Sequence, residues 1–165
     1  MTNALDVVPS SDEINTGVVD RDAMAQGVEH MLADTYRLIF KTHAVHWNVE
    51  GALFYAVHNL TETQYNDLFT AADEIAERIR ALGHLAPATL SSIVSHSVVQ
   101  DDETPSSAGE MCEDLAADHE RVARRLHDLI STADEAGDPV TEDMATERAA
   151  FHEKAAWMLR AIAKS

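Results

Sequence analysis

The sequence has a single cysteine, no long apolar run and no basic leader. Cys112 stands alone among 165 residues, so no disulfide can form within the chain. No apolar run approaches the length of about 18 residues that a membrane-spanning helix needs. The N-terminal segment has no basic stretch followed by an apolar one, so it does not read as a secretory signal. We therefore expect no membrane segment and a cytoplasmic location.

Basic residues are also scarce, which limits the partners that the surface can attract. The chain has 12 Lys and Arg against 29 Asp and Glu, a formal net charge of −17. Such a surface repels phosphate backbones and attracts cations. Residues 1–22 carry five acids and Arg21 as their one basic residue, so we do not expect direct DNA binding; binding would make the protein nucleoid-associated. The acidity is equally compatible with a role in solubility or with a high-salt habitat.

Few aromatics, glycines and prolines interrupt the middle of the chain, which favours long helices. Residues 1–19 are small, polar and acidic, and we expect a flexible tail there, followed by one domain at 20–165. Apolar residues at three- and four-residue steps, from Val28 to Val45 in the first case and from Val140 to Ile162 in the last, form stripes that predict four long helices. The first helix runs from Asp20 to about Asn48–Gly51, and the second from Leu53 to Gly83. The third runs from Ser106 to a linker at Asp134–Asp138, and the fourth begins at Pro139. Between the second and third helices we expect a crossover at 84–104 that contains a short helix near Ala88–Val94. Four helices with one long crossover predict an all-α, ferritin-like four-helix bundle.

Two pairs of metal-ligating side chains lie on the second of these helices. His58 and Glu62 are four residues apart, and so are Asp73 and Glu77, so each pair shares one helical face. The pairs lie about 16 Å apart along the axis at the helical rise per residue, so one metal ion cannot bind both. They are either two weak sites or two half-sites. An antiparallel second copy of the helix, related by a two-fold axis, would complete two equivalent centres, with His46 joining the first half-site.

The chemistry of these side chains favours a redox-active divalent metal. Three carboxylates and two imidazoles without a thiolate suit Fe(II), Mn(II) or Zn(II). Hard anionic oxygens stabilise Fe(III), and imidazoles keep the site competent for Fe(II). The sequence contains no Glu-x-x-His, the motif of bundles that build a di-iron site inside one subunit, which disfavours that type of centre. A site that takes up Fe(II) and oxidises it is therefore the leading hypothesis.

The motifs around these residues resemble those of the Dps family of miniferritins. The resemblance covers about residues 25–163 and depends on the run His46-Trp47-Asn48-Val49-Glu50-Gly51, on Phe54 and His58, on Asp73-Glu74-Ile75-Ala76-Glu77-Arg78-Ile79, and on Glu153–Ala161. It implies a hollow homododecamer with ferroxidase centres at its two-fold interfaces. It further implies oxidation of Fe(II), with hydrogen peroxide or O2 as oxidant, storage of ferric mineral inside the shell, and protection against oxidative stress.

The resemblance also assigns roles to single residues. It implies that His46, His58 and Glu62 of one chain bind iron together with Asp73 and Glu77 of the partner, and that Trp47 lies beside the iron and intercepts radicals. The family usually has Asp where this chain has Glu62, so direct binding and binding through water both stay open there. Asp134 and Asp143 match positions that line a three-fold pore through which iron enters; the alternative is that such acids only stabilise a helix N-terminus.

Two other classes of function remain as alternatives. Some Dps proteins compact the chromosome through a lysine-rich tail, which this chain lacks. A structural shell with an inactive metal site is the other alternative. Among the remaining histidines, His43 precedes His46 by one helical turn and is a candidate accessory residue.

Overall fold

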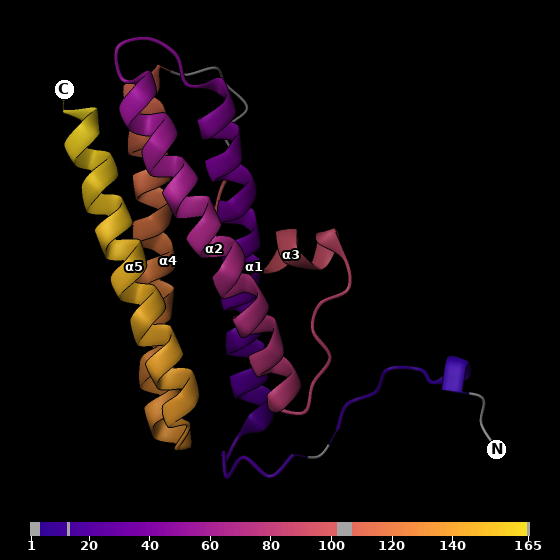
Figure 1. Cartoon of the computed structure of the whole chain (residues 1–165). Coiled ribbons are helices and arrows are strands. Elements are labelled where there is room, and N and C mark those ends of the chain that lie inside the picture. The colour runs from indigo at the N-terminus through magenta and orange to yellow at the C-terminus, as the bar shows by residue number, and fades with distance from the viewer. Residues whose placement is uncertain (1–3, 13, 102–106, 165) are drawn as a thin grey trace.

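The computed structural model describes residues 4–12, 14–101 and 107–164, and these residues form helices and loops without a strand. Four long helices, α1 (Arg21–Asn48), α2 (Phe54–Ala81), α4 (Ala108–Ala136) and α5 (Pro139–Ala163), lie side by side (Figure 1). The short helix α3 (Leu90–His96) lies beside α1 in the crossover, and a single 3-10 turn, η1 (Ala4–Asp6), lies in the N-terminal segment. The predicted all-α, ferritin-like four-helix bundle with a helix-containing crossover is confirmed.

Helix starts follow the capping signals of the sequence. The Asp20 side chain accepts a hydrogen bond from the backbone N–H of Ala23 and caps α1 as predicted. Asp138 caps α5 with Pro139 in its first turn, also as predicted. Helix α4 begins after Ser107, which forms a reciprocal capping box with Glu110.

Helix α1 ends at Asn48, within the predicted range, but one predicted cap and one predicted helix end are wrong. We expected Gly51 to cap α1, but the C-cap is Val49 in an extended conformation, and Gly51 lies in the following turn with φ of 86°. We expected a linker over Asp134–Asp138, but α4 continues to Ala136 and ends at Gly137, whose φ of 66° is left-handed. Asp134 therefore belongs to the last turn of α4. Helix α4 extends beyond its predicted end because Ala133 and Ala136 are apolar and pack in the interior.

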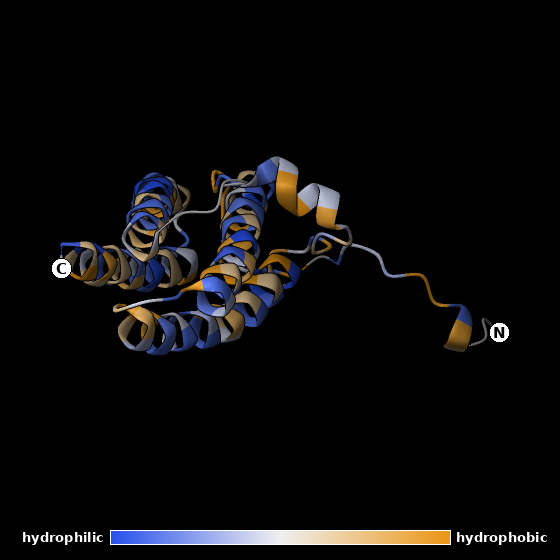
Figure 2. Cartoon of the chain, turned by 90° about the horizontal axis from the view of Figure 1, so that it is seen from above, coloured by the Kyte–Doolittle hydropathy of each residue, from blue (hydrophilic) through white to orange (hydrophobic). Residues whose placement is uncertain are grey.

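Each long helix contributes apolar residues to one core. Figure 2 looks down the bundle and shows hydrophilic and hydrophobic residues on every long helix. The fully buried side chains include Leu38 of α1, Leu68 of α2, Leu115 of α4 and Leu159 of α5. Because burial of such side chains is the dominant favourable contribution to folding, the amphipathic pattern of the sequence accounts for the bundle.

Two buried carboxylates hold the crossover on the bundle. Asp34 of α1 accepts hydrogen bonds from Ser97 Oγ (2.8 Å) and from the Val98 backbone N–H (2.7 Å), and pairs with Arg125 of α4 (3.0 Å). Asp118 of α4 accepts a hydrogen bond from the Gln100 backbone N–H and pairs with Lys41. The crossover thus links α1 to α4 in a fixed register.

The N-terminal segment also contacts the helices. The Val19 backbone N–H donates to the carbonyl of Ala136 (3.1 Å), and Arg80 donates to the carbonyl of Ser10 (3.3 Å). A flexible tail at 1–19 stays a prediction. None of the helices in the described ranges is long and apolar enough to cross a membrane.

Candidate metal centre

His46 and His58 face each other at the end of the bundle where α1 turns into α2. Their rings stack with centroids 3.7 Å apart and planes inclined by 18°. His46 Nδ1 donates to the backbone carbonyl of His58 (2.9 Å), and His58 Nδ1 donates to the backbone carbonyl of His46 (3.0 Å). The two helices are thus joined by a reciprocal pair of hydrogen bonds.

These hydrogen bonds determine which ring nitrogens remain for a metal ion. A carbonyl oxygen only accepts, so each Nδ1 carries a proton, and in the neutral imidazole Nε2 keeps its lone pair. Metal-binding histidines are commonly oriented in this way by a partner of the second nitrogen. Thr61 Oγ1 lies 3.3 Å from His46 Nδ1 and donates to the Val57 carbonyl, which further orients the His46 ring. The pair fits the requirements of an imidazole half-site.

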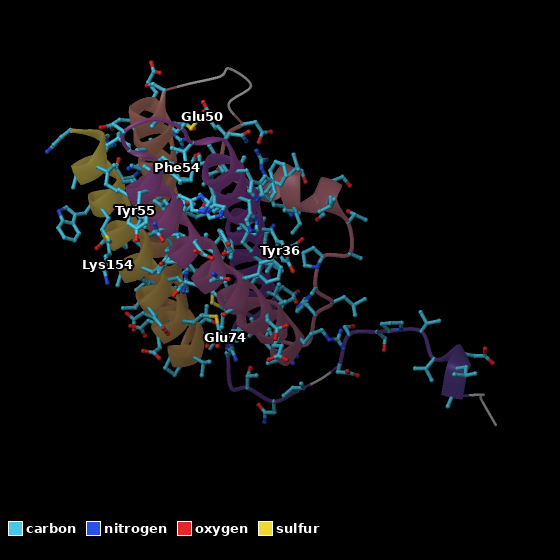
Figure 3. All side chains as sticks on the ribbon, turned by 45° about the horizontal axis from the view of Figure 1, so that its top comes forward. Tyr36, Glu50, Phe54, Tyr55, Glu74 and Lys154 are labelled. Carbon is cyan, nitrogen blue, oxygen red and sulfur yellow. The ribbon has the colours of Figure 1, made fainter. Side chains whose placement is uncertain are left out.

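The three predicted carboxylate ligands lie on the outside of α2. Glu62, Asp73 and Glu77 are all exposed, and α2 continues without a break through all three positions. In Figure 3, Phe54 and Tyr55 mark the start of α2, and Glu74 lies much further along the same helix. The helix therefore separates Glu62 from Asp73 in the way that the sequence predicts.

Within one chain the structure brings together only part of the predicted set. His46 and His58 are in contact, whereas the described residues contain no group of three or more His, Cys, Asp or Glu side chains placed to hold one metal ion. Trp47, the residue after His46, is exposed on α1. The assignment of these residues to a shared centre stays a prediction.

Aromatic rings extend from the histidine pair along α1 and α2. Tyr65 contacts His46 edge-on, with centroids 5.2 Å apart, and lies closer to His43, with centroids 4.0 Å apart. His43 in turn stacks on Trp47 at 5.0 Å, and Phe54 stacks on His58 at 4.9 Å. Burial and the proximity of His46 lower the pKa of His43 from its ordinary value, which favours the neutral ring.

Sequence reasoning identified His43 as an accessory candidate but missed Tyr65 and Thr61. Tyr65 follows His58 by seven residues and Glu62 by three, so helical spacing alone places it on the same face. Thr61 could not be found in this way, because its role depends on the approach of α1.

Large apolar side chains lie exposed on the same two helices. Tyr36, Phe40 and Trp47 follow each other along one side of α1, and Phe69 is exposed on α2 between Glu62 and Asp73. Exposed apolar side chains that gather on neighbouring helices commonly mark an interface. These side chains lie on the helices that carry the predicted ligands, and Trp157 of α5 is a further exposed one on the bundle.

The two predicted pore residues lie near the α4–α5 turn. Asp134 is exposed in the last turn of α4, and Asp143 is exposed near the start of α5. Asp138, between them, is buried and pairs with Arg78 of α2 at 2.7 Å. Burial opposes its ionisation, but hydrogen bonds from Arg78 and Thr141 outweigh burial and lower the pKa of Asp138. The Asp138 carboxylate therefore has a structural role as the partner of Arg78 and Thr141.

Comparison with known proteins agrees with this fold. The profile of the ferritin-like domain family matches residues 25–165. A DNA protection during starvation protein of Helicobacter pylori is 33% identical over 81% of this chain and 94% of its own length. The crystal structure of Dps from Staphylococcus aureus superposes with a TM-score of 0.83 at 30% identity, covering 87% of this chain and 96% of that one. Antigen TpF1 from Treponema pallidum superposes with a TM-score of 0.84 at 31% identity, covering 90% and 98%.

The four-helix bundle and the family match over residues 25–165 place the chain in the class of ferritin-like proteins. Within that class, the chain belongs to the Dps family. Proteins of this family generally store iron and protect the cell.

Proposed function

We propose that this protein is a ferroxidase that oxidises Fe(II) with hydrogen peroxide at centres shared between two chains. The observation that carries the proposal is the reciprocal His46–His58 hydrogen-bonded pair, which leaves two Nε2 lone pairs free to bind iron. His46, His58 and Glu62 of one chain bind the ion together with Asp73 and Glu77 of a two-fold related partner.

Iron is the substrate of this reaction, and the ligands favour its oxidation. Carboxylate oxygens are hard anionic donors that bind Fe(III) more tightly than Fe(II), which lowers the potential of the couple. Two Fe(II) reduce one peroxide according to 2 Fe²⁺ + H₂O₂ + 2 H⁺ → 2 Fe³⁺ + 2 H₂O. Paired electron transfer of this kind avoids free hydroxyl radical, which accounts for protection against oxidative stress.

The proposal includes assembly into a hollow homododecamer that stores the ferric product. The exposed apolar residues of α1 and α2 support a two-fold contact beside the ligands, because their burial would stabilise the dimer. Asp134 and Asp143 would line the pore through which iron enters, where their carboxylates attract cations.

Mixed assembly of two inactive variants tests the shared centre. His58→Ala damages one half-site and Asp73→Ala the other, so shells of either variant alone are expected to be inactive. In a dimer of one His58→Ala chain and one Asp73→Ala chain, both lesions fall in the same centre and the second centre is intact. Reassembly of a mixture after denaturation should therefore restore ferroxidation, measured as ferric absorbance when peroxide is added to anaerobic Fe(II)-loaded protein.

The control replaces Glu74, an exposed acid on α2 next to Asp73, with Ala, and this variant is expected to keep wild-type activity. No ferric absorbance from wild type would show an inactive structural shell. A mixture that stays as inactive as the single variants would contradict a centre shared between two chains.

A further inference from the structure

A layer of polar side chains crosses the interior of the bundle close to the histidine pair. This polar layer consists of Thr42 of α1, Gln64 of α2, His119 of α4 and Arg148 of α5, all of them buried. Thr42 Oγ1, both amide atoms of Gln64, His119 Nε2, and Nε and Nη2 of Arg148 have no hydrogen-bond partner among the described residues. Buried polar atoms in folded proteins normally bind protein groups, water or an ion, because leaving them unpaired costs free energy. The polar layer is therefore suited to bind a small polar molecule.

On α1 and α2 the polar layer lies one helical turn from the candidate iron ligands. His46 Nδ1 of α1 lies 3.3 Å from Thr61 Oγ1 of α2, which fixes the register of the two helices. Thr42 lies one turn before His46, and Gln64 lies one turn after Thr61. Because α1 and α2 are joined by a short turn and run antiparallel, Thr42 and Gln64 lie at the same level of the bundle (Figure 1).

Contacts of α5 place His119 and Arg148 at this level too. Arg148 pairs with Asp67 of α2 at 2.8 Å, and Gln64 lies one turn before Asp67. His152 lies one turn after Arg148 on α5, and its Nδ1 is 2.8 Å from His119 Nδ1. Burial lowers the pKa of both histidines, and the positive charge of Arg148 lowers it further. The polar layer thus extends from the level below the histidine pair to Asp67, whose side chain is 45% exposed.

The unpaired atoms of the polar layer match the hydrogen-bonding groups of hydrogen peroxide. Arg148 and the Gln64 amide nitrogen donate, the Gln64 amide oxygen accepts, and Thr42 Oγ1 and His119 Nε2 can do either. Hydrogen peroxide has two O–H donors and two acceptor oxygens, so it satisfies both kinds of partner at once. An anion cannot donate to the Gln64 amide oxygen, and a metal ion is repelled by the positive charge of Arg148.

We propose that the polar layer is a binding site for hydrogen peroxide, which it holds one helical turn from His46 before the peroxide reaches the iron. This inference rests on the proposed ferroxidase function. In the proposed dimer the partner covers the exposed side of α1 and α2, so the interior of the bundle remains as an approach to His46. Peroxide is polar and enters an apolar interior at a cost that hydrogen-bonding groups remove. Dioxygen is apolar and needs no such site, so the polar layer favours peroxide as the oxidant.

Two substitutions remove hydrogen-bonding atoms from the polar layer and leave its shape nearly unchanged. Thr42→Val replaces a hydroxyl with a methyl group, and Gln64→Met replaces an amide with a thioether of similar length. Because the replaced atoms have no partner among the described residues, neither change leaves another protein group unpaired, and both variants are expected to fold. The matched control is Thr132→Val at an exposed position of α4.

Stopped-flow oxidation with two oxidants tests the site. Assembled protein loaded anaerobically with Fe(II) is mixed with hydrogen peroxide or with O2, and ferric absorbance is followed. In Thr42→Val and Gln64→Met the second-order rate constant for peroxide is expected to fall about threefold to tenfold, the range that one hydrogen bond contributes. The rate with O2 and the affinity for Fe(II) are expected to match those of wild type and Thr132→Val. An unchanged rate constant for peroxide, or an equal fall with both oxidants, would overturn the inference.

Iron-free crystals of the assembled protein test the binding separately, because they require no ferroxidation. Water fits the same atoms, so crystals soaked with peroxide are compared with unsoaked crystals. Two-lobed density between Gln64 and His119 is expected in the soaked crystals alone. Identical water peaks in both, or no density in either, would overturn the site even if ferroxidation is confirmed. If wild type forms no Fe(III) with either oxidant, the proposed function fails, and the crystals still decide whether the polar layer binds peroxide.

Discussion

His119 of α4 and His152 of α5 are fully buried inside the bundle and form a hydrogen bond with each other. Their Nδ1 atoms are 2.8 Å apart, so one ring donates and the other, unprotonated at Nδ1, accepts. Burial lowers the pKa of His119 to about 3, although the negative charge of Asp118 opposes the shift. Burial, His119 and Arg148 lower the pKa of His152 well below its usual range.

This pair predicts a loss of stability in acid. An unfolded chain takes up a proton at each histidine below about pH 6.5, whereas the folded chain does not until about pH 3 for His119. Stability is therefore fully present above pH 6.5 and falls as the pH drops, by about 1.4 kcal/mol per pH unit for each histidine. The double change His119→Leu/His152→Leu should flatten the decrease in denaturant midpoint between pH 7 and pH 5; an unchanged slope would contradict this account.

The sequence predicts the features of single residues that depend only on helical spacing. It does not predict contacts that depend on how a distant helix approaches. Helical spacing predicted that His58 and Glu62 share a face, but not that His58 Nδ1 donates to His46. Asp118 and His119 are polar residues, yet both are fully buried. Their partners come from other elements, and no local pattern encodes those contacts.

At the scale of helices, the predicted apolar stripes are confirmed except at one end. The stripe of α1, from Val28 to Val45, is buried at every predicted position. Val140 was placed in the stripe of the last helix but is 54% exposed, because the first turn of α5 is held by Asp138 and Thr141 instead. Periodicity identifies the buried face of a long helix well, and it is weakest in the terminal turns.

A buried ion pair fixes the start of α5 against α2. Arg78 donates to Asp138 (2.7 Å) and to Thr141 Oγ1 (3.0 Å), and all three side chains are buried. Arg78→Ala leaves the Asp138 carboxylate buried without its cation, and the expected loss of unfolding free energy is about 3–5 kcal/mol. Chemical denaturation measures it.

The matched control for this prediction is Arg124→Ala on the exposed side of α4, which is expected to change stability by less than about 0.5 kcal/mol. Equal effects of Arg78→Ala and Arg124→Ala would show that the ion pair does not stabilise the junction.

At the scale of the whole molecule, the exposed apolar side chains of α1 predict the way in which chains associate. Phe40 is 67% exposed on the same helix as His46. Phe40→Glu places a charge where the proposed two-fold contact buries an apolar ring, so the variant should dissociate into smaller species in analytical ultracentrifugation. Val8→Glu, at an exposed position of the N-terminal segment, should not. A Phe40→Glu variant of unchanged size would place the two-fold contact elsewhere.

The charge of the molecule predicts its behaviour toward nucleic acid. With a net charge of −17 on every chain, an assembly repels a phosphate backbone most strongly at low ionic strength, where screening is weakest. A gel-shift assay at low salt and without added metal should therefore show no retardation of DNA. Retardation under these conditions would reveal a basic patch that the net charge hides.

Helix α2 carries the halves of two different proposed centres, His58 with Glu62 and Asp73 with Glu77, and this has a genetic consequence. In a dimer, a chain with both His58→Ala and Asp73→Ala removes one ligand from each of the two centres. Both centres are then inactive even when the partner chain is wild type. Such an allele should behave as dominant when co-expressed with wild type, with activity falling toward the square of the wild-type fraction. Alleles that damage one half-site alone should lower activity only in proportion to the wild-type fraction, because each leaves one centre of a mixed dimer whole.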